Sequence, residues 1–227
     1  MAPKMYEFTQ MFKDVQFKKD DILLDLGCGE GSLLFILAKK IKLGVGVDIL
    51  KHCIDDAEIK ANEIKHRVNV EFHCQKLEEI KFPSESFDKV VSFSMIEHIP
   101  NYLEIFEETF RIIKKGGELI VSVDSFSHFN EKQRAVHQKT FEVQKYFEKQ
   151  ELYDLLKEIG FSEVHVEPIF KSKFAKKWFT RVMNNPGEYF AWHKRLYSFF
   201  LYYVIHWHEK KIKRVEHGIF LIARCKK

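Results

Sequence analysis

The sequence predicts an α/β protein with a mostly parallel, seven-stranded sheet and helices on both faces. Three observations predict this fold class. Short apolar runs alternate with segments of helical periodicity along the 227 residues, the first run ends in a glycine-rich turn, and the second ends in an acidic residue. Such alternation is typical of βα units that build a parallel sheet buried on both faces.

The apolar runs give the expected order of elements. Strands are expected at 22–26, 43–48, 68–73, 87–92, 117–123, 161–167 and 218–225, with the last one antiparallel. Helices are expected up to about Val15 and between the strands, including 33–41, 51–65 and 102–113. We expect a single domain over 1–227, with a helical insertion at 171–217 before the last strand.

The most informative stretch is 23–32, where an apolar run, an acid and three alternating glycines lead into a helix. Gly27, Gly29 and Gly31 lie between strand and helix. Because glycine allows left-handed backbone and close approach, the loop is expected to hold a nucleotide-like ligand beside a helix N-terminus. The dinucleotide fingerprint G-x-G-x-x-G is not matched, because the third glycine comes one residue early and position 32 is Ser.

Two acidic residues narrow the class of ligand. The carboxylate of Asp25, just before the turn, would repel a pyrophosphate and attract a cation such as a sulfonium that carries an amino group. Asp48 ends the second apolar run, where an acid can accept hydrogen bonds from ribose hydroxyls.

These residues resemble the first motif of the class I S-adenosylmethionine-dependent methyltransferases, D-x-G-x-G-x-G. Three further stretches resemble the same family in order: 82–92 its fourth-strand entry, 96–100 the following loop, and 110–117 the helix end and turn before the fifth strand. The resemblance covers 25–123. It implies a Rossmann-like methyltransferase fold with S-adenosylmethionine as cofactor and S-adenosylhomocysteine as product.

The resemblance also implies where the cofactor lies. Asp25 and Gly27 would face its amino acid portion, Asp48 the ribose, and Ile49 the adenine. Where the family often has an acid that meets the adenine amino group, this chain has Gln75, whose amide oxygen could accept that hydrogen bond. The expected cofactor site is completed by Cys28, Gly29, Gly31, Lys76, Leu77 (packed on the adenine ring), Phe93 and Ser94.

Methyl transfer from a sulfonium is an in-line displacement, so positioning in a dry pocket can supply most of the acceleration. A hydroxyl acceptor would gain about 10² to 10⁴ more from a general base. His98, after the fourth strand, is the first candidate, and His128 and His137, after the fifth, are the alternatives. The opposing interpretation is that Glu97 and His98 only fix their loop and that the other two histidines are surface residues.

The Glu97–His98 pair resembles two subgroups that methylate oxygen, the quinone-precursor O-methyltransferases and the small-RNA 2′-O-methyltransferases. Both tend to carry an earlier glutamate where this chain has Ser94, and the RNA subgroup has a second histidine where this chain has Ile99. We therefore expect O-methylation of a small, lipophilic acceptor and no metal. RNA 2′-O-methylation, a non-catalytic cofactor-binding module, a nicotinamide-dependent reductase, and N- or C-methylation stay open as alternatives.

Charge and aromatic residues concentrate near the C-terminus. Residues 171–227 carry a net +11 and residues 1–170 a net −7, within the overall +4. The stretch 196–207 is nearly all apolar and flanked by cations, but it is shorter than the roughly 20 residues that span a bilayer. The insertion is expected to be either a cap over the site or a membrane-interface element. A nucleic-acid surface is disfavoured, because its aromatic and polar residues would interleave.

The cysteines and the N-terminal residues indicate the cellular compartment that we expect. Cys28, Cys53, Cys74 and Cys225 have no C-x-x-C spacing, which predicts neither disulfides nor a zinc site. The pair His206 and His208 also lacks the spacing of a helical metal site. Residues 1–10 contain no apolar h-region, so we expect a cytoplasmic protein, with a peripheral membrane location as the alternative. The oligomeric state is left open.

Overall fold

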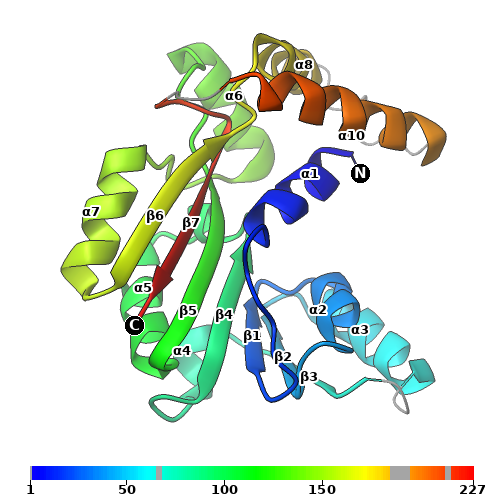
Figure 1. Cartoon of the computed structure of the whole chain (residues 1–227), viewed down its shortest axis with the longest axis vertical. Coiled ribbons are helices and arrows are strands. Elements are labelled where there is room, and N and C mark those ends of the chain that lie inside the picture. The colour runs from blue at the N-terminus through cyan, green and yellow to red at the C-terminus, as the bar shows by residue number, and fades with distance from the viewer. Residues whose placement is uncertain (1, 65–67, 185–194, 213–215) are drawn as a thin grey trace.

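The computed structural model describes residues 2–64, 68–184, 195–212 and 216–227 (Figure 1). One seven-stranded sheet has the order β3-β2-β1-β4-β5-β7-β6. Of these strands, β7 runs against its neighbours, since it pairs antiparallel with both β5 and β6. This confirms the predicted fold class. The strands are β1 (Ile22–Leu26), β2 (Leu43–Asp48), β3 (Val70–Cys74), β4 (Phe87–Phe93), β5 (Ile113–Asp124), β6 (Ser162–Ile169) and β7 (Phe220–Lys226).

Apolar side chains from both faces of the sheet form two cores. One core joins Leu24 and Val90 to the helices α4, α5 and α7, and the other joins Leu23 and Val91 to α1, α2, α8 and α10. Burial on both faces explains why the strands are continuous apolar runs. The helices are α1 (Ala2–Met11), α2 (Ser32–Leu37), α3 (Lys51–Ile64), α4 (Leu77–Ile80), the 3₁₀ turn η1 (Ile96–His98), α5 (Tyr102–Ile112), α6 (Glu131–Phe141), α7 (Lys149–Ile159), α8 (Lys173–Asn184) and α10 (Arg195–Lys210).

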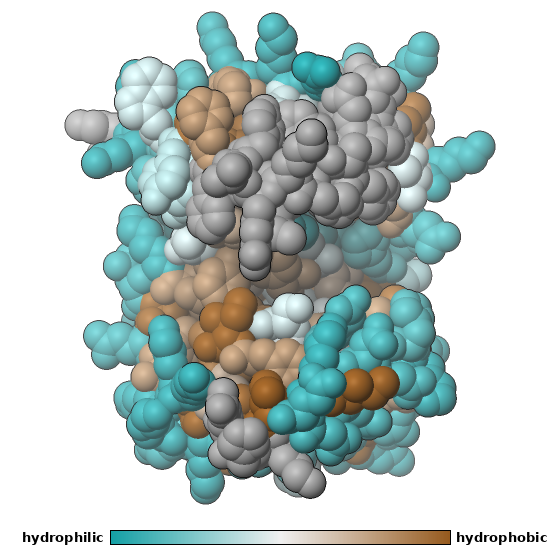
Figure 2. All heavy atoms as spheres, turned by 90° about the vertical axis from the view of Figure 1, so that its right-hand side faces the viewer, coloured by the Kyte–Doolittle hydropathy of each residue, from teal (hydrophilic) through white to brown (hydrophobic). Residues whose placement is uncertain are grey.

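Figure 1 shows α1, α6, α8 and α10 gathered at one end of the sheet, beyond the carboxyl ends of its parallel strands. In the view of Figure 2, hydrophilic side chains cover much of the two ends of the molecule, and apolar surface is visible in the hollow between them. Ligands of open α/β sheets bind at the carboxyl ends of the strands. The four helices therefore lie over the edge where a site is expected.

Three elements differ from the sequence expectations. The helix expected at 33–41 ends at Leu37. The fifth strand begins at Ile113 and includes the expected turn, because Gly116 takes a left-handed φ of 76° within the strand. A helix, α6, occupies 131–141, where the sequence lacks strong periodicity. Its signal is the cap: Asn130 accepts from the Gln133 amide at 2.9 Å, and the Gln133 side chain accepts from the Asn130 amide at 3.0 Å.

The predicted insertion at 171–217 contains α8 and α10, while residues 185–194 and 213–215 lie outside the described residues. A buried carboxylate joins the two helices. Glu209 of α10 accepts hydrogen bonds from the backbone amides of Lys171 and Ser172, both at 2.8 Å. Both amides lie just before the first residue of α8, and Glu209 is their acceptor. Phe174 of α8 also stacks on His208 of α10, with ring centroids 4.8 Å apart.

The Glu209→Ala substitution is expected to lower the free energy of unfolding by about 1–3 kcal/mol, because it leaves buried amides without an acceptor. Glu216→Ala, which removes only an exposed ion pair to Lys149, should cost about 0–1 kcal/mol. Urea unfolding followed by circular dichroism measures both variants. Equal stability of the two variants would contradict the role given to Glu209.

Candidate functional site

A cavity of about 440 Å³ lies at the carboxyl ends of β1, β2 and β4. It brings together seven of the residues that the sequence predicted for the site, namely Gly27, Asp48, Ile49, Gln75, Lys76, Leu77 and His98. The remainder of its wall was not predicted and is mostly apolar, consisting of Leu26, Val47, Met95, Ile99, Pro100, Asn101 and Ile105. A concave, mostly apolar pocket with a few polar groups is the usual form of a small-molecule site.

The glycine loop (residues 27–31) forms one edge of this cavity. Gly27, Gly29 and Gly31 have φ values of 75°, 52° and 73°, in the region that favours glycine. A Cβ at Gly27 would collide with Met95, and one at Gly31 would lie 2.7 Å from the Phe72 ring. At Gly29 a Cβ would meet open space between the described residues. The loop thus follows a path that only glycine allows, and it leaves room beside Gly29.

Asp48 is held in place by the loop beside it. Its Oδ2 accepts from the Gly29 amide at 2.8 Å, and its Oδ1 accepts from the Leu50 amide at 2.9 Å. The loop is also bonded to β2 itself, since the amides of Gly27 and Cys28 donate to the Val47 carbonyl at 2.8 and 3.1 Å. The Asp48 carboxylate is therefore oriented in the cavity wall and retains lone pairs for a ligand's hydroxyl groups.

Asp25 lies behind the loop, fully buried, and is not among the residues that line the cavity. Its Oδ2 has no hydrogen-bond partner among the described residues. Burial, and secondarily the charge of Asp48, raise the pKa of Asp25 to about 8. A buried carboxyl group without a donor is costly unless a ligand supplies one. The Asp25 carboxyl group therefore fits a ligand that carries an ammonium group next to the glycine loop.

Two apolar residues and an amide follow β2 and β3 in the wall of the cavity. Ile49 is exposed although it is apolar, Leu77 is buried at the start of α4, and Gln75 is exposed beside them. All three residues line the cavity, as the sequence predicted for the site. Cys28 lies buried beneath the loop, where it packs near Gly46, and its side chain is not part of the cavity wall.

Phe93 ends β4 and Ser94 follows it, and neither residue lines the cavity. Ser94 has a left-handed φ of 49°, a strained conformation for a residue other than glycine. Its hydroxyl donates to Oε1 of Glu7 on α1 at 2.6 Å and accepts from the Lys4 ammonium at 2.9 Å. Glu7 thus brings a carboxylate from α1 to the carboxyl end of β4, within hydrogen-bond distance of Ser94.

A carboxyl cluster, Glu7, Glu97 and Asp124, is buried below α1. Ser122 donates to Glu7 at 2.6 Å, and within the described part of the chain neither carboxyl oxygen of Glu97 has a hydrogen-bond partner. Burial and then the charge of Asp124 raise the pKa of Glu97 well above its usual range, and burial raises that of Asp124 to about 7. Sequence reasoning missed this cluster, although Asp124 ends the fifth apolar run just as Asp48 ends the second.

The three candidate histidines are separated by the fold. Of the three, His98 alone lines the cavity, and burial lowers its pKa. His137 is buried behind it, with Nδ1 2.8 Å from the Tyr146 hydroxyl and Nε2 3.9 Å from Oδ2 of Asp124. Neither ring nitrogen of His128 has a hydrogen-bond partner in the described segments. Burial lowers the pKa of His128 and of His137 to about 4.

Across 2–64, 68–184, 195–212 and 216–227, no group of three or more His, Cys, Asp or Glu is arranged to hold a metal ion.

Comparison with known proteins connects this geometry to a family. The family model described as "Methyltransferase domain" matches residues 17–160. A Coxiella burnetii protein named ubiquinone biosynthesis O-methyltransferase is 32% identical over 100 residues, which cover 44% of this chain and 42% of that protein. The match therefore spans less than half of the length of that relative.

Solved structures share the fold at low identity. Phosphoethanolamine N-methyltransferase 2 of Haemonchus contortus, solved with phosphomonomethylethanolamine and S-adenosylhomocysteine, has a TM-score of 0.68 at 18% identity, over 99% of this chain and 52% of that one. A Bacillus halodurans protein titled a putative methyltransferase has a TM-score of 0.66 at 21% identity, over 96% of this chain and 97% of that one. The family match, the sheet order and the glycine loop agree: the chain belongs to the methyltransferase-domain family and has the Rossmann-like fold of the class I S-adenosylmethionine-dependent methyltransferases.

Proposed function

We propose that the protein transfers the methyl group of S-adenosylmethionine to an oxygen atom of a small acceptor with an apolar body. The observation that carries this proposal is the cavity itself, in which cofactor-binding residues and His98 share one mostly apolar wall. The relative named an O-methyltransferase supports oxygen as the methylated atom. A small acceptor suits the size of the cavity, about 440 Å³.

We place the cofactor by matching its chemical groups to the polar and apolar side chains around the cavity. Asp25 would receive its ammonium group, the glycine loop its amino acid portion, and Asp48 its ribose hydroxyls. Ile49 and Leu77 would enclose the adenine, and Gln75 would accept from its amino group. Cys28, Lys76, Phe93 and Ser94 are assigned to the rim and support of this site. The bound cofactor supplies an activated methyl group, so the chain's main task is to orient the acceptor and exclude water.

His98 is our candidate for the general base. It lines the cavity, and its lowered pKa keeps the imidazole neutral and able to accept a proton at pH 7. His137 contacts Tyr146 and Asp124 behind the cavity and is assigned a positioning role. We assign no role to His128, which packs on Phe129 at a ring distance of 4.6 Å.

We further propose that the insertion at 171–217 rests on an anionic membrane surface, which would present lipid-like acceptors to the site. Phe200, Tyr203 and Trp207 occur at helical spacing on α10 with side chains 65%, 66% and 57% exposed. The Lys211 ammonium lies over the Trp207 ring at 3.1 Å from its centroid.

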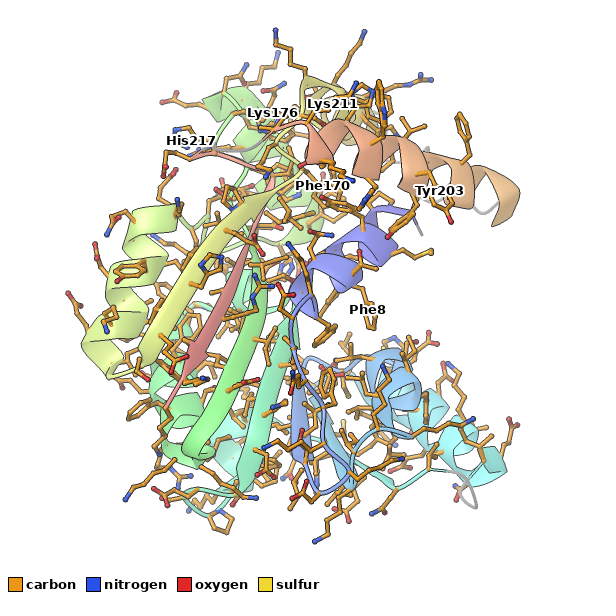
Figure 3. All side chains as sticks on the ribbon, viewed as in Figure 1. Phe8, Phe170, Lys176, Tyr203, Lys211 and His217 are labelled. Carbon is orange, nitrogen blue, oxygen red and sulfur yellow. The ribbon has the colours of Figure 1, made fainter. Side chains whose placement is uncertain are left out.

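Basic residues in the insertion support the proposal that it rests on an anionic membrane surface. Lys173, Lys177 and Arg181 recur along the exposed side of α8. Figure 3 shows Lys176 of α8 and Lys211, which follows α10, at the same end of the molecule. Aromatic rings at headgroup depth with cations beside them are typical of helices that lie in a membrane interface. Among the helices of the described residues, none has the length and apolar character needed to cross a bilayer.

Purified protein should release S-adenosylhomocysteine when given a hydroxyl-bearing acceptor from pooled lipids, quinone precursors, sugars or RNA. His98→Gln should lower kcat by about 10² to 10⁴, because the base is removed, and leave the affinity for S-adenosylhomocysteine unchanged. Product analysis by mass spectrometry identifies the methylated atom. A product methylated only on nitrogen or carbon would refute oxygen as the acceptor atom, and an unimpaired His98→Gln variant would refute the base.

Cofactor binding should release a proton. Asp25, with a pKa of about 8, is mostly protonated in the free protein at pH 7, and an ammonium partner would ionise it. The release should approach one proton near pH 7 and vanish as the pH rises above 8, because the carboxyl group is then already ionised. Calorimetry in buffers of different ionisation enthalpy measures this number. Asp25→Asn should remove this contribution and weaken binding; the same proton release in wild type and variant would exclude Asp25 as the ammonium partner.

Full-length protein should co-sediment with vesicles of phosphatidylcholine and phosphatidylserine, and less with phosphatidylcholine alone. Replacing Phe200, Tyr203 and Trp207 together by serine should weaken partitioning at least about tenfold, or about 1.4 kcal/mol. Ile59→Ser on α3 is the matched control, because Ile59 is also an exposed apolar residue. If wild type and the triple variant sediment alike, the insertion does not bind membranes through this stripe.

A further inference from the structure

The ammonium group of Lys4 occupies a pocket built from three kinds of group. Its Nζ lies 4.5 Å from the centroid of the Phe93 ring and 5.8 Å from that of Phe220. It donates to the Ser94 hydroxyl at 2.9 Å and pairs with Oε2 of Glu7 at 3.2 Å. An aromatic face, a hydroxyl acceptor and a carboxylate together are what a protein offers to an alkylammonium ion. We call this arrangement the ammonium pocket.

The ammonium pocket has more negative groups behind it than Lys4 satisfies. Glu97 is fully buried, and among the described residues its carboxyl group has the carboxyl group of Asp124 as its neighbour, with no N–H or hydroxyl donor on either oxygen. The charges of Lys4, Asp124 and Glu7 all act on Glu97, which places it in the same cluster. Adjacent buried carboxyl groups repel each other when both are ionised, so a cation beside them is stabilised. A positively charged amino group is such a cation.

The ammonium group of Lys4 can leave the pocket and be replaced by that of a ligand. Its side chain is 41% exposed, whereas that of Glu7 is completely buried and bonded to both Ser94 and Ser122. A lysine stem has several rotatable bonds, so the ammonium group can move out while the pocket keeps its shape. The pocket also adjoins the cofactor cavity, because Met95, the residue after Ser94, lines that cavity and lies against Gly27.

We propose that the ammonium pocket binds a positively charged amino group of the methyl acceptor, and that Lys4 holds the place of that group in the free protein. The acceptor is then a small amine whose apolar body reaches the cofactor cavity. This inference rests on the proposed function, since it names the substrate class of the same site. It leaves the methylated atom as proposed, a hydroxyl oxygen elsewhere on that molecule.

Two alternative roles for Lys4 lead to different results when the residue is removed. If Lys4 binds the carboxylate of the cofactor, its removal weakens cofactor binding. If Lys4 serves only as an ion pair that fixes α1, its removal lowers stability and creates no site. Measurements of cofactor affinity, amine affinity and thermal stability on one Lys4 variant therefore distinguish the three roles.

The experiment measures binding of phenethylammonium to the complex with S-adenosylhomocysteine, by calorimetry or ligand-observed NMR. The uncharged 2-phenylethanol is the matched probe. Lys4→Met should bind phenethylammonium about tenfold more tightly than wild type, because the internal competitor is gone. Its affinity for 2-phenylethanol should be unchanged. The double variant Lys4→Met, Glu7→Gln should lose the gain.

Lys13→Met, which removes an exposed lysine just after α1, controls for net charge and should behave as wild type. Thermal melting of every variant checks folding. Equal affinity of Lys4→Met and wild type for phenethylammonium would overturn the proposal, as would weaker binding of S-adenosylhomocysteine by Lys4→Met. Because the assay needs no turnover, its outcome is independent of the proposed O-methylation, and failure of wild type to bind S-adenosylhomocysteine would instead contradict the cofactor placement.

Discussion

The attachment of the glycine loop to the end of β2 is the constraint on which the site depends. Three left-handed glycines let the main chain reach the Val47 carbonyl and the Asp48 carboxylate with its own amides. This contact fixes the Asp48 side chain, leaves room at Gly29, and keeps Asp25 buried behind the turn. A Cβ at Gly27 or Gly31 would meet Met95 or Phe72, so the loop and the elements packed around it depend on one another.

Buried carboxyl groups set the electrostatics of the whole edge. Asp25 lies under the loop, and the carboxyl cluster of Glu7, Glu97 and Asp124 lies under α1. Burial raises the pKa of Asp25 and Asp124 to about 8 and 7, so both groups hold protons near neutral pH. Such groups persist at a cost in stability, which is typical of residues retained for function. The edge is thus suited to cations, whether on the cofactor or on the acceptor.

Local sequence signals predicted the sheet, and seven of the residues that they singled out line the cavity at its edge. Apolar runs, glycines and strand-terminal acids act over a few residues, and the parallel topology then brings Gly27, Asp48 and Gln75 to one cavity. The arrangement of side chains under α1 was not predictable in this way. Glu7 and Ser94 meet across 87 positions of sequence, and α6 has its clearest signal in the Asn130 cap. Contacts between distant segments depend on packing, which a single sequence does not display.

The most direct test of the cofactor placement is a crystal structure of the protein with S-adenosylhomocysteine. We expect the ammonium nitrogen of the ligand within hydrogen-bond distance of the Asp25 carboxylate, and its ribose hydroxyls on Asp48. The adenine should lie between Ile49 and Leu77. A ligand bound elsewhere, or an Asp25 carboxyl group that still lacks a donor in the complex, would contradict this placement.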